Sequence, residues 1–326
     1  MSTSGILIEQ TISIFIILVL GVICYKTKLI DDTTNSKLSN ILLTLVQPTL
    51  IFTSFQREFN IDLVEGLIIS LVLALITHIV AISISYIFIR RKKKKIIVVD
   101  GVRTVTYVEN KDVDVERLTS GYANMGFIGI PLAYGLYGSE GVFYVTASVM
   151  TFNILMWTHG VIMISGTKEL KFKDILMRLK SPAIIAIFLG LIVFIFQIRL
   201  PNVLNQSLNY IGSINTPFGM LIAGATIAKT DIVKMFIGNL RKYYMVFLKL
   251  LFIPFVLMLI YVRLPIDDTL KMIAIIMAAT PTTTIGTILT IRYKKNSVLA
   301  AEIFAMTTLL CVFTIPFIIK VAELLM

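Results

Sequence analysis

The chain has few of the side chains that build metal centres, cofactor sites or catalytic centres. It contains two cysteines, Cys24 and Cys311, and two histidines, His78 and His159, among 326 residues. Two cysteines inside apolar runs do not form a disulfide framework or a thiolate metal site, and two histidines do not form a histidine-rich cluster. We therefore expect no metal site, no cofactor and no catalytic residues.

Charged side chains are also scarce, at 15% of the chain, whereas hydrophobic residues make up 57% and the mean hydropathy is +0.89. A soluble domain has about 45–50% apolar and about 25% charged residues. The charges that are present are unbalanced, because 30 Lys and Arg against 19 Asp and Glu give a net charge of +11. Such an excess suggests nucleic-acid binding only in a soluble protein with a basic patch, whereas this composition indicates a membrane protein.

No lysine or arginine precedes Lys26, so the first apolar run lacks the basic region of a secretory signal peptide. We expect this run to stay in the mature protein. A helix needs roughly 20 apolar residues to cross about 30 Å of hydrocarbon. The sequence predicts ten such spans, which are 6–25, 38–56, 66–89, 118–137, 141–164, 182–198, 203–228, 243–262, 270–291 and 298–319.

The basic residues predict the orientation of these spans, because short cytoplasmic loops collect Lys and Arg. With the N-terminus outside, 24 of the 30 basic residues fall on the cytoplasmic side, 5 fall outside, and Lys249 lies within a span. The net charge is therefore an orientation signal, and we expect no nucleic-acid partner. The prediction is a multi-pass protein of the plasma membrane, surrounded by the lipid bilayer, with both termini extracytoplasmic.

The loop at 90–117 holds the densest basic run. Residues 90–95 read Arg-Arg-Lys-Lys-Lys-Lys directly after a span, which we interpret as a topology anchor that also contacts anionic lipid. A nucleic-acid patch is the alternative. Residues 96–109 then alternate apolar and polar around Asp100-Gly101, which predicts a cytoplasmic β-hairpin.

The two halves of the chain show matching residues. Five spans precede the linker at 166–181 and five follow it, and a repeat with an odd number of spans inserts upside down relative to its partner. We therefore predict inverted repeats over 1–165 and 182–326, joined by a cytoplasmic linker. The matches are Asn40 with Asn209, Pro48 with Pro217 and 62–64 with 231–233 at an offset of 169, and Tyr137 with Tyr293, Val142 with Val298 and 150–151 with 306–307 at an offset of 156.

Helix-breaking residues gather near the middle of the fourth and ninth spans. Proline removes a backbone donor, and irregular backbone at membrane depth is tolerated where it is buried or lines a cavity. Each proline suits the first position of a half-helix, and two half-helix N-termini at one midplane point attract an anion. The alternative is a pair of kinked packing helices with glycine at close contacts. The predicted substrate-binding residues are Asn124, Gly126, Gly129, Pro131, Pro281, Thr282, Thr283 and Thr284.

Several of these motifs are characteristic of a known family. Asn124 is followed by Gly129-Ile-Pro131-Leu and by Tyr137-Gly138, Pro281 is followed by Tyr293, and the stretch 40–52 contains Gln-Pro-x-Leu-Ile-Phe. In these features the chain resembles the auxin efflux carrier family, which includes plant auxin exporters and bacterial and archaeal malate-permease-like carriers. The resemblance covers essentially all of the membrane portion.

The resemblance implies an all-α, bile-acid-symporter-like fold. Spans 1, 2, 6 and 7 would form a scaffold, and spans 3–5 and 8–10 a mobile transport domain in which the broken fourth and ninth spans cross beside the substrate. It also implies that Asn124 contacts a substrate carboxylate. The three threonines after Pro281 depart from the plant pattern, and the long plant cytosolic loop is replaced by 166–181. We further expect a homodimer through the scaffold helices.

Ionisable residues in the spans are functional candidates, because a charge at the bilayer centre costs at least about 2.5–3.5 kcal/mol. Lys249 and Glu302 share one depth as the spans are drawn, which predicts that they pair. In the alternative, Lys249 extends inward to the membrane surface and Glu302 faces a water-filled vestibule. His78 is either a proton-coupling residue or a hydrogen-bonded structural imidazole. Gln47 and Asn153 either line the cavity or form interhelical hydrogen bonds.

The predicted function is secondary transport of small organic anions, either mono- or dicarboxylates, by alternating access with an elevator motion. The alternatives are a cation-coupled symporter of another bile-acid-symporter-like class, an intramembrane enzyme and a channel. An enzyme would need catalytic groups at matched depth, whereas we expect His78 and His159 at different depths without acidic or nucleophilic partners. A channel would need a continuous polar stripe along several spans, which most spans lack.

Overall fold

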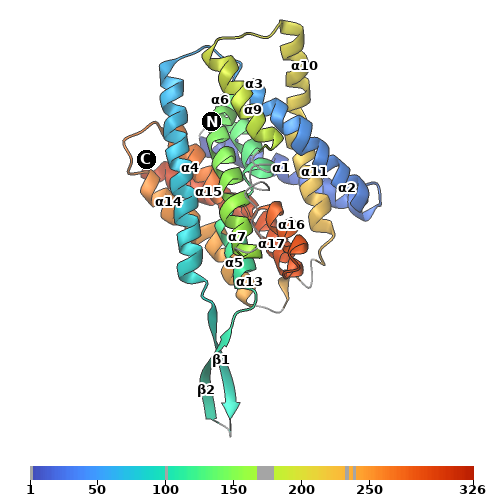
Figure 1. Ribbon diagram of the computed structural model, residues 1–326, viewed down its shortest axis with the longest axis vertical. Coiled ribbons are helices and arrows are strands. Elements are labelled where there is room, and N and C mark those ends of the chain that lie inside the picture. The colour runs from blue at the N-terminus through green and yellow to red at the C-terminus, as the bar shows by residue number, and fades with distance from the viewer. Residues whose placement is uncertain (1–2, 100–101, 167–179, 232–234, 238–239) are drawn as a thin grey trace.

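The computed structural model describes residues 3–99, 102–166, 180–231, 235–237 and 240–326. Within these ranges the chain is almost entirely helical, apart from one two-stranded sheet (Figure 1). Six helical stretches are long and apolar enough to cross a membrane, which is consistent with the predicted helical membrane protein. They are Glu9–Lys26, Ile61–Phe88, Met125–Ser165, Asn202–Ala228, Leu240–Tyr261 and Ser297–Leu325.

Several helices of the first half begin where a polar side chain caps the first turn. Asp31 Oδ1 accepts the N–H of Thr34 at 2.7 Å, and Asn60 Oδ1 accepts the N–H of Asp62 at 2.9 Å, which satisfies backbone donors without an intrahelical partner. The elements in order are α1 (Thr3–Lys26), α2 (Asp32–Ile41), the π-helical turn η1 (Leu42–Val46), α3 (Gln47–Ser54), α4 (Ile61–Phe88), β1 (Lys92–Val99), β2 (Val102–Glu109), α5 (Val113–Gly121), the π-helical turn η2 (Met125–Gly129), α6 (Ile130–Leu155), the π-helical turn η3 (Met156–Gly160) and α7 (Val161–Ser165).

The second half uses the same capping chemistry. Asp267 Oδ1 accepts the N–H of Thr269 at 2.8 Å, and Asn296 Oδ1 accepts the N–H of Leu299 at 3.1 Å. The elements in order are α9 (Pro182–Ile195), α10 (Asn202–Ser213), α11 (Asn215–Ala228), α13 (Leu240–Phe247), the π-helical turn η5 (Leu248–Phe252), α14 (Ile253–Tyr261), α15 (Asp268–Ala279), α16 (Thr284–Arg292) and α17 (Ser297–Leu325).

Three prolines are accommodated inside helices by π-helical turns. Pro48, Pro131 and Pro254 each stand two residues after the end of a turn, which is η1, η2 or η5 respectively. In each turn an N–H is donated five residues back rather than four, which makes room for the proline ring and its missing donor. The predicted half-helix start at Pro131 is therefore wrong, because the helix begins at Met125 and continues through the proline.

The stretch Met125–Ser165 is not one straight helix. Gly138 has φ +57° and ψ −144°, a conformation open to glycine because it has no Cβ. A Cβ added at Gly141 would lie 2.4 Å from the carbonyl oxygen of Ala133, whereas eight residues of straight helix cover about 12 Å. The chain therefore turns back on itself at Gly138.

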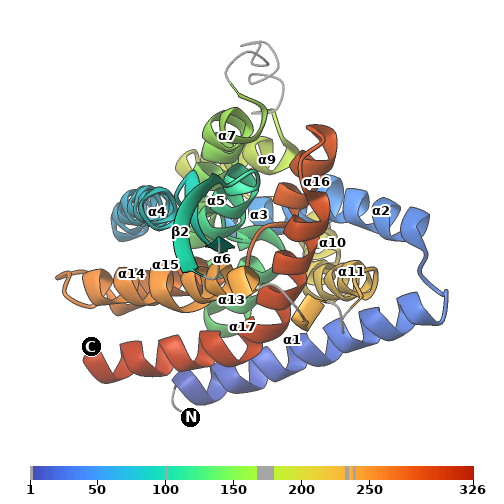
Figure 2. The same ribbon diagram turned by 90° about the horizontal axis from the view of Figure 1, so that it is seen from below.

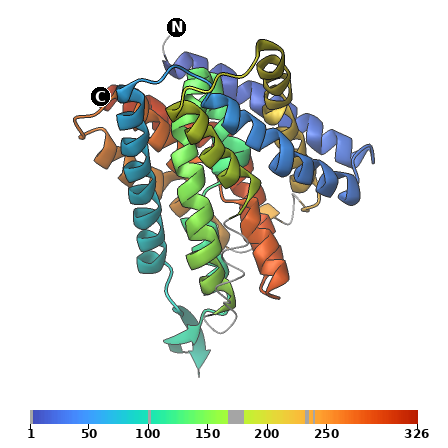
Figure 3. The same ribbon diagram turned by 45° about the horizontal axis from the view of Figure 1, so that its top comes forward.

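The predicted hairpin is confirmed in its two strands, β1 and β2, which pair antiparallel from Lys92 with Glu109 to Val99 with Val102. Its predicted turn, Asp100-Gly101, lies outside the described residues, as does most of the predicted linker 166–181, at 167–179. Figure 1 shows the hairpin projecting beyond the helices as a continuation of α4. In Figure 3 both chain termini lie at the end of the molecule opposite the hairpin.

Close backbone contacts hold α1 against the second half of the chain. A Cβ added at Gly224 of α11 would lie 2.0 Å from the Leu18 carbonyl oxygen, and one added at Gly21 would lie 2.4 Å from that of Leu221. Small residues permit this approach in membrane helices. Figure 2 shows α1 and α17 extending beside each other, with the two termini close together.

Candidate functional site

Two interruptions in the helices meet at one place in the fold. Residues 122–124 separate α5 from η2, and residues 280–283 separate α15 from α16. An antiparallel bridge pairs Ala123 with Thr282. The Asn124 N–H donates to the Pro281 carbonyl at 2.7 Å, and the Thr283 N–H donates to the Tyr122 carbonyl at 3.3 Å. The two buried segments thus satisfy each other's backbone groups.

Pro281 does not begin a half-helix, in contrast to the prediction. It lies inside the interruption, and α16 begins three residues later, at Thr284. Thr283 caps that helix, because its Oγ1 accepts the N–H of Ile285 at 3.3 Å. Proline has no N–H for a helical bond, and here its carbonyl is used instead as the acceptor for Asn124.

A cavity of about 260 Å³ lies beside the crossing segments. It is bordered by α2, η1, α3, η2, α6, η3 and the starts of α9 and α16. The residues that line it are Asn40, Leu43, Thr44, Gln47, Asn124, Met125, Gly126, Phe127, Val149, Phe152, Asn153, Trp157, Ser181, Pro182, Ala183, Thr283, Thr284 and Ile285.

Both half-helices begin at this cavity. Asn124 caps η2, because its Oδ1 accepts the N–H of Phe127 at 3.3 Å, and Thr283 caps α16. The N-terminus of a helix carries a partial positive charge and unpaired N–H groups. Two such termini at one cavity favour a negatively charged ligand.

The Asn124 amide nitrogen is a buried donor that no described residue satisfies. Asn124 is 3% exposed, and its Nδ2 has no hydrogen-bond partner among the described residues. Its Oδ1 is already used as the helix cap, so the nitrogen is the group left for a ligand. An unsatisfied buried polar group costs about 1–3 kcal/mol, and a bound acceptor removes that cost.

The cavity lining is electrically neutral. None of the described residues that line it is charged. Amide side chains come from Asn40, Gln47 and Asn153, and an apolar aromatic wall includes Phe152 and Trp157. The lining therefore offers a ligand hydrogen-bonding groups and backbone dipoles rather than a partner for a salt bridge.

Some predicted site residues line the cavity and others do not. Asn124, Gly126, Thr283 and Thr284 do, together with Gln47 and Asn153 of the secondary group. Gly126 lies so close to Gln47 that a Cβ there would be 2.8 Å from the Gln47 Nε2.

Four other predicted residues do not line the cavity. A Cβ added at Gly129 would lie 2.8 Å from the Met277 sulfur. Thr282 is fully buried, and its hydroxyl donates to the Thr119 carbonyl. Pro131 lies within α6, and Pro281 lies within the interruption.

Several lining residues escaped the sequence reasoning. Asn40 and Thr44 share one helix face with the predicted Gln47, because they precede it by seven and three residues, so the sequence did contain a signal for them. Trp157 is the chain's one tryptophan, and its place within a span is a second such signal. Ser181, which caps α9 by accepting the N–H of Ile184 at 3.4 Å, carried no signal of its own.

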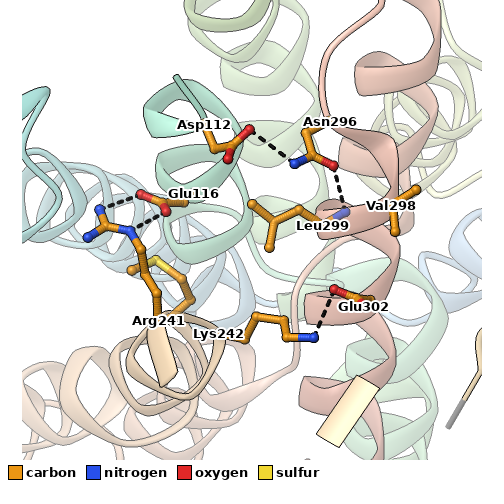
Figure 4. Close-up of a pocket in the computed structure, with 9 residues that line it drawn as sticks. Asp112, Glu116, Arg241, Lys242, Asn296, Val298, Leu299 and Glu302 are labelled. Carbon is orange, nitrogen blue, oxygen red and sulfur yellow. Dashed lines mark hydrogen bonds and ion pairs between the residues drawn. The ribbon is translucent and has the colours of Figure 1, made fainter. Parts of the chain in front are cut away.

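The predicted pairing of Lys249 with Glu302 is wrong. Glu302 pairs with Lys242 at 3.0 Å, as Figure 4 shows, while Lys249 Nζ donates to the Ala278 carbonyl at 3.3 Å. The reason is the position of the helix starts. With α13 beginning at Leu240, Lys249 is the tenth residue of its helix, whereas Glu302 is the sixth of α17, so Lys249 lies deeper.

The Lys242–Glu302 pair borders a second, charged cavity of about 180 Å³ between α5, α13 and α17. Opposite that pair, Arg241 binds both carboxylate oxygens of Glu116, which is 2% exposed (Figure 4). The Asn110 amide also donates to Glu116 Oε2, at 2.6 Å. Through these bonds, both the end of the hairpin and helix α5 are attached to α13.

His78 does not line the 260 Å³ cavity. With Lys249 and Ala123 it borders a void of about 10 Å³, and its Nδ1 lies 2.7 Å from the Ala74 carbonyl oxygen. Both histidines pack against Tyr122, and their difference in depth stays a prediction. The His78 and His159 rings lie 6.3 Å and 6.2 Å from the Tyr122 ring, centroid to centroid.

Comparison with known proteins adds the family. The family model described as membrane transport protein matches residues 6–319. An uncharacterized transporter of Methanothermobacter thermautotrophicus is 24% identical over 225 residues, which cover 67% of each chain. An uncharacterized transporter of Methanocaldococcus jannaschii is 30% identical over 118 residues, which cover 34% of this chain and 37% of that protein. A membrane transporter is consistent with the expectation that the chain is not an enzyme. The chain belongs to the membrane transport protein family, that of the auxin efflux carrier-like proteins.

Proposed function

We propose that this protein is a secondary transporter of small organic anions and that its substrate carboxylate binds in the 260 Å³ cavity. The observation that carries the proposal is the free Nδ2 of Asn124, a buried donor at the point where two half-helices begin. A carboxylate oxygen accepts from that nitrogen while the two helix N-termini stabilise its charge.

The lining favours one carboxylate on an apolar body over a dicarboxylate. A second carboxylate would have to leave water without a cation among the described lining residues, and burial of an unpaired charge is strongly unfavourable. The aromatic rings of Phe127, Phe152 and Trp157 instead contribute apolar surface. Monocarboxylates are therefore the preferred substrates within the proposed class.

The proposed architecture is ten spans in two inverted repeats. Support comes from the reversal at Gly138, which divides Met125–Ser165 into two spans, and from the paired interruptions in α5–α6 and α15–α16. The hairpin and the termini lie at opposite ends of the molecule (Figure 3), which supports extracytoplasmic termini if the basic hairpin is cytoplasmic, and the proposed location is the plasma membrane. In this proposal the crossing helices move with α4 and α13–α17 as one elevator domain, and two copies associate through scaffold helices.

Counterflow in liposomes tests the function. Protein reconstituted with an unlabelled carboxylate inside should accumulate the same labelled carboxylate from outside, across a panel of aromatic, branched and dicarboxylic acids. Asn124→Ala should lower the exchange rate at subsaturating substrate about 10- to 150-fold, because a hydrogen bond to a charged group contributes about 1.5–3 kcal/mol.

Asn209→Ala is the matched control, because Asn209 is exposed on α10 and outside the cavity. It should exchange substrate at the wild-type rate. Absence of exchange by the wild type for the whole panel would reject the carboxylate assignment. Equal exchange by Asn124→Ala and wild type would reject the proposed site.

A further inference from the structure

The His159 imidazole is hydrogen-bonded at both ring nitrogens. Its Nδ1 lies 2.9 Å from the hydroxyl oxygen of Tyr122, and its Nε2 lies 3.3 Å from the hydroxyl oxygen of Tyr86. The two tyrosines come from different parts of the fold. Tyr86 lies near the end of α4, and Tyr122 lies in the interruption after α5.

Each tyrosine hydroxyl has one proton to donate, and this determines which atom donates in each hydrogen bond of the row Tyr86–His159–Tyr122. The Tyr122 hydroxyl donates to the Leu155 carbonyl at 3.0 Å, and a phenol has one proton. The contact with His159 therefore uses a proton on Nδ1, and in the neutral ring Nε2 accepts from Tyr86. When a second proton binds, Nε2 donates to the Tyr86 oxygen instead. The imidazole gains or loses a proton without losing a hydrogen bond.

The two tyrosines at the ends of this hydrogen-bonded row lie in different surroundings. Tyr86 is 39% exposed and borders a cavity of about 380 Å³ together with Arg91, Asp114 and Lys295. Tyr122 is fully buried, and its main-chain carbonyl accepts the N–H of Thr283 at the crossing. The hydrogen-bonded chain thus extends from a polar cavity to the segment that positions Asn124.

The charged side chains described around Tyr86 are three cations and one carboxylate. The guanidinium of Arg117, on α5, stacks over the Tyr86 ring at 4.1 Å. Arg91, Asp114 and Lys295 face Tyr86 across its cavity, and His78 lies beyond Tyr122. A carboxylate bound near the crossing adds negative charge and favours protonation, and by linkage protonation then favours carboxylate binding.

We propose that His159 binds and releases the proton that couples carboxylate transport to a pH gradient. The proton enters through Tyr86, and Tyr122 links its charge to the substrate site. This inference rests on the proposed function and adds its driving ion. His78, the chain's other histidine, lies outside this row of hydrogen bonds, because its Nδ1 contacts the carbonyl of Ala74 in its own helix and its Nε2 has no partner among the described residues.

Nitrogen NMR of histidine-labelled protein tests the inference without a substrate. In His78→Gln, His159 gives the only imidazole signals. We expect a neutral form protonated at Nδ1 that becomes doubly protonated as the pH falls through the range of about 8 to 5. Tyr122→Phe should convert the neutral form to the Nε2-protonated tautomer. A ring that keeps one protonation state throughout that range would overturn the proposal.

Transport supplies the second test, with a carboxylate that passes the counterflow assay. Accumulation in liposomes with an imposed pH gradient is divided by accumulation without one, so that differences in protein insertion cancel. The ratio should exceed one for wild type and His78→Gln and fall to one for His159→Gln. Tyr86→Phe should slow the approach to the final ratio.

The outcomes separate this inference from the proposed function. If the wild type shows no counterflow, the proposed function fails. If the wild type shows counterflow and His159→Gln keeps the wild-type ratio, only the role of His159 fails. Loss of the ratio in His159→Gln together with a His159 signal that titrates supports the coupling.

Discussion

Lys242 and Lys249 show two ways in which this protein buries an ammonium group. They stand seven residues apart, about two turns, in the continuous helix formed by α13 and η5, and they are 5% and 1% exposed. Lys242 has a carboxylate partner, Glu302. Lys249 donates to the Ala278 carbonyl in the last turn of α15, where the helix dipole is negative.

The two lysines should respond differently to replacement by methionine, which preserves most of the side-chain length. Lys242→Met leaves Glu302 without its cation and should lower the free energy of unfolding by about 1–3 kcal/mol. Lys249→Met removes a desolvated charge bonded to a neutral carbonyl, so it should be neutral or stabilising. Thermal unfolding in detergent measures both. A larger loss for Lys249→Met than for Lys242→Met would contradict this comparison.

At the scale of elements, the close approach of α1 and α11 depends on two glycines that face backbone atoms. A flexible side chain near an added Cβ can move aside, as Gln47 can near Gly126. The Leu18 and Leu221 carbonyls that face Gly224 and Gly21 are parts of helices, so they move only if a helix moves.

Gly224→Ala should therefore separate α1 from α11 and lower the free energy of unfolding by about 1–3 kcal/mol. Gly121→Ala serves as the matched control, because its added Cβ would lie 3.4 Å or more from its neighbours. We expect the melting temperature in detergent to fall for Gly224→Ala and to stay within error for Gly121→Ala. Equal melting temperatures for the two variants would contradict this prediction, because they would show that α1 and α11 accommodate the added methyl group without loss of stability.

At the scale of the whole molecule, the hairpin and the loop before α4 mark opposite sides of the membrane in the proposed topology. Tyr107, on β2, is 62% exposed, and the Glu58 side chain is 84% exposed. Both positions are therefore accessible to a reagent in solution.

Single cysteines at these positions test the orientation in a background with Cys24 and Cys311 replaced by serine. In intact cells, a membrane-impermeant maleimide should label Glu58→Cys and spare Tyr107→Cys. Permeabilised cells should allow labelling of both. The reverse pattern would place the hairpin outside and invert the topology.

Features that depend on neighbouring residues were predicted from the sequence more successfully than contacts between distant residues. The alternation around residues 100–101 identified the hairpin strands, and polar residues inside apolar spans directed attention to Asn124, Gln47 and Asn153. The Lys242–Glu302 pair was missed because relative depth depends on where two distant helices begin. The neighbours of His159 were missed for a similar reason, because Tyr86 and Tyr122 are 73 and 37 residues away in sequence.

Because none of the described cavity-lining residues is charged, the empty binding site contributes no charge of its own when it moves across the membrane. A carboxylate bound alone would carry one negative charge, and a membrane potential of 100 mV changes the energy of that step by about 2.3 kcal/mol. With a proton on His159 the loaded protein is neutral at this site. A monocarboxylate would then cross without an electric current, and a dicarboxylate would not.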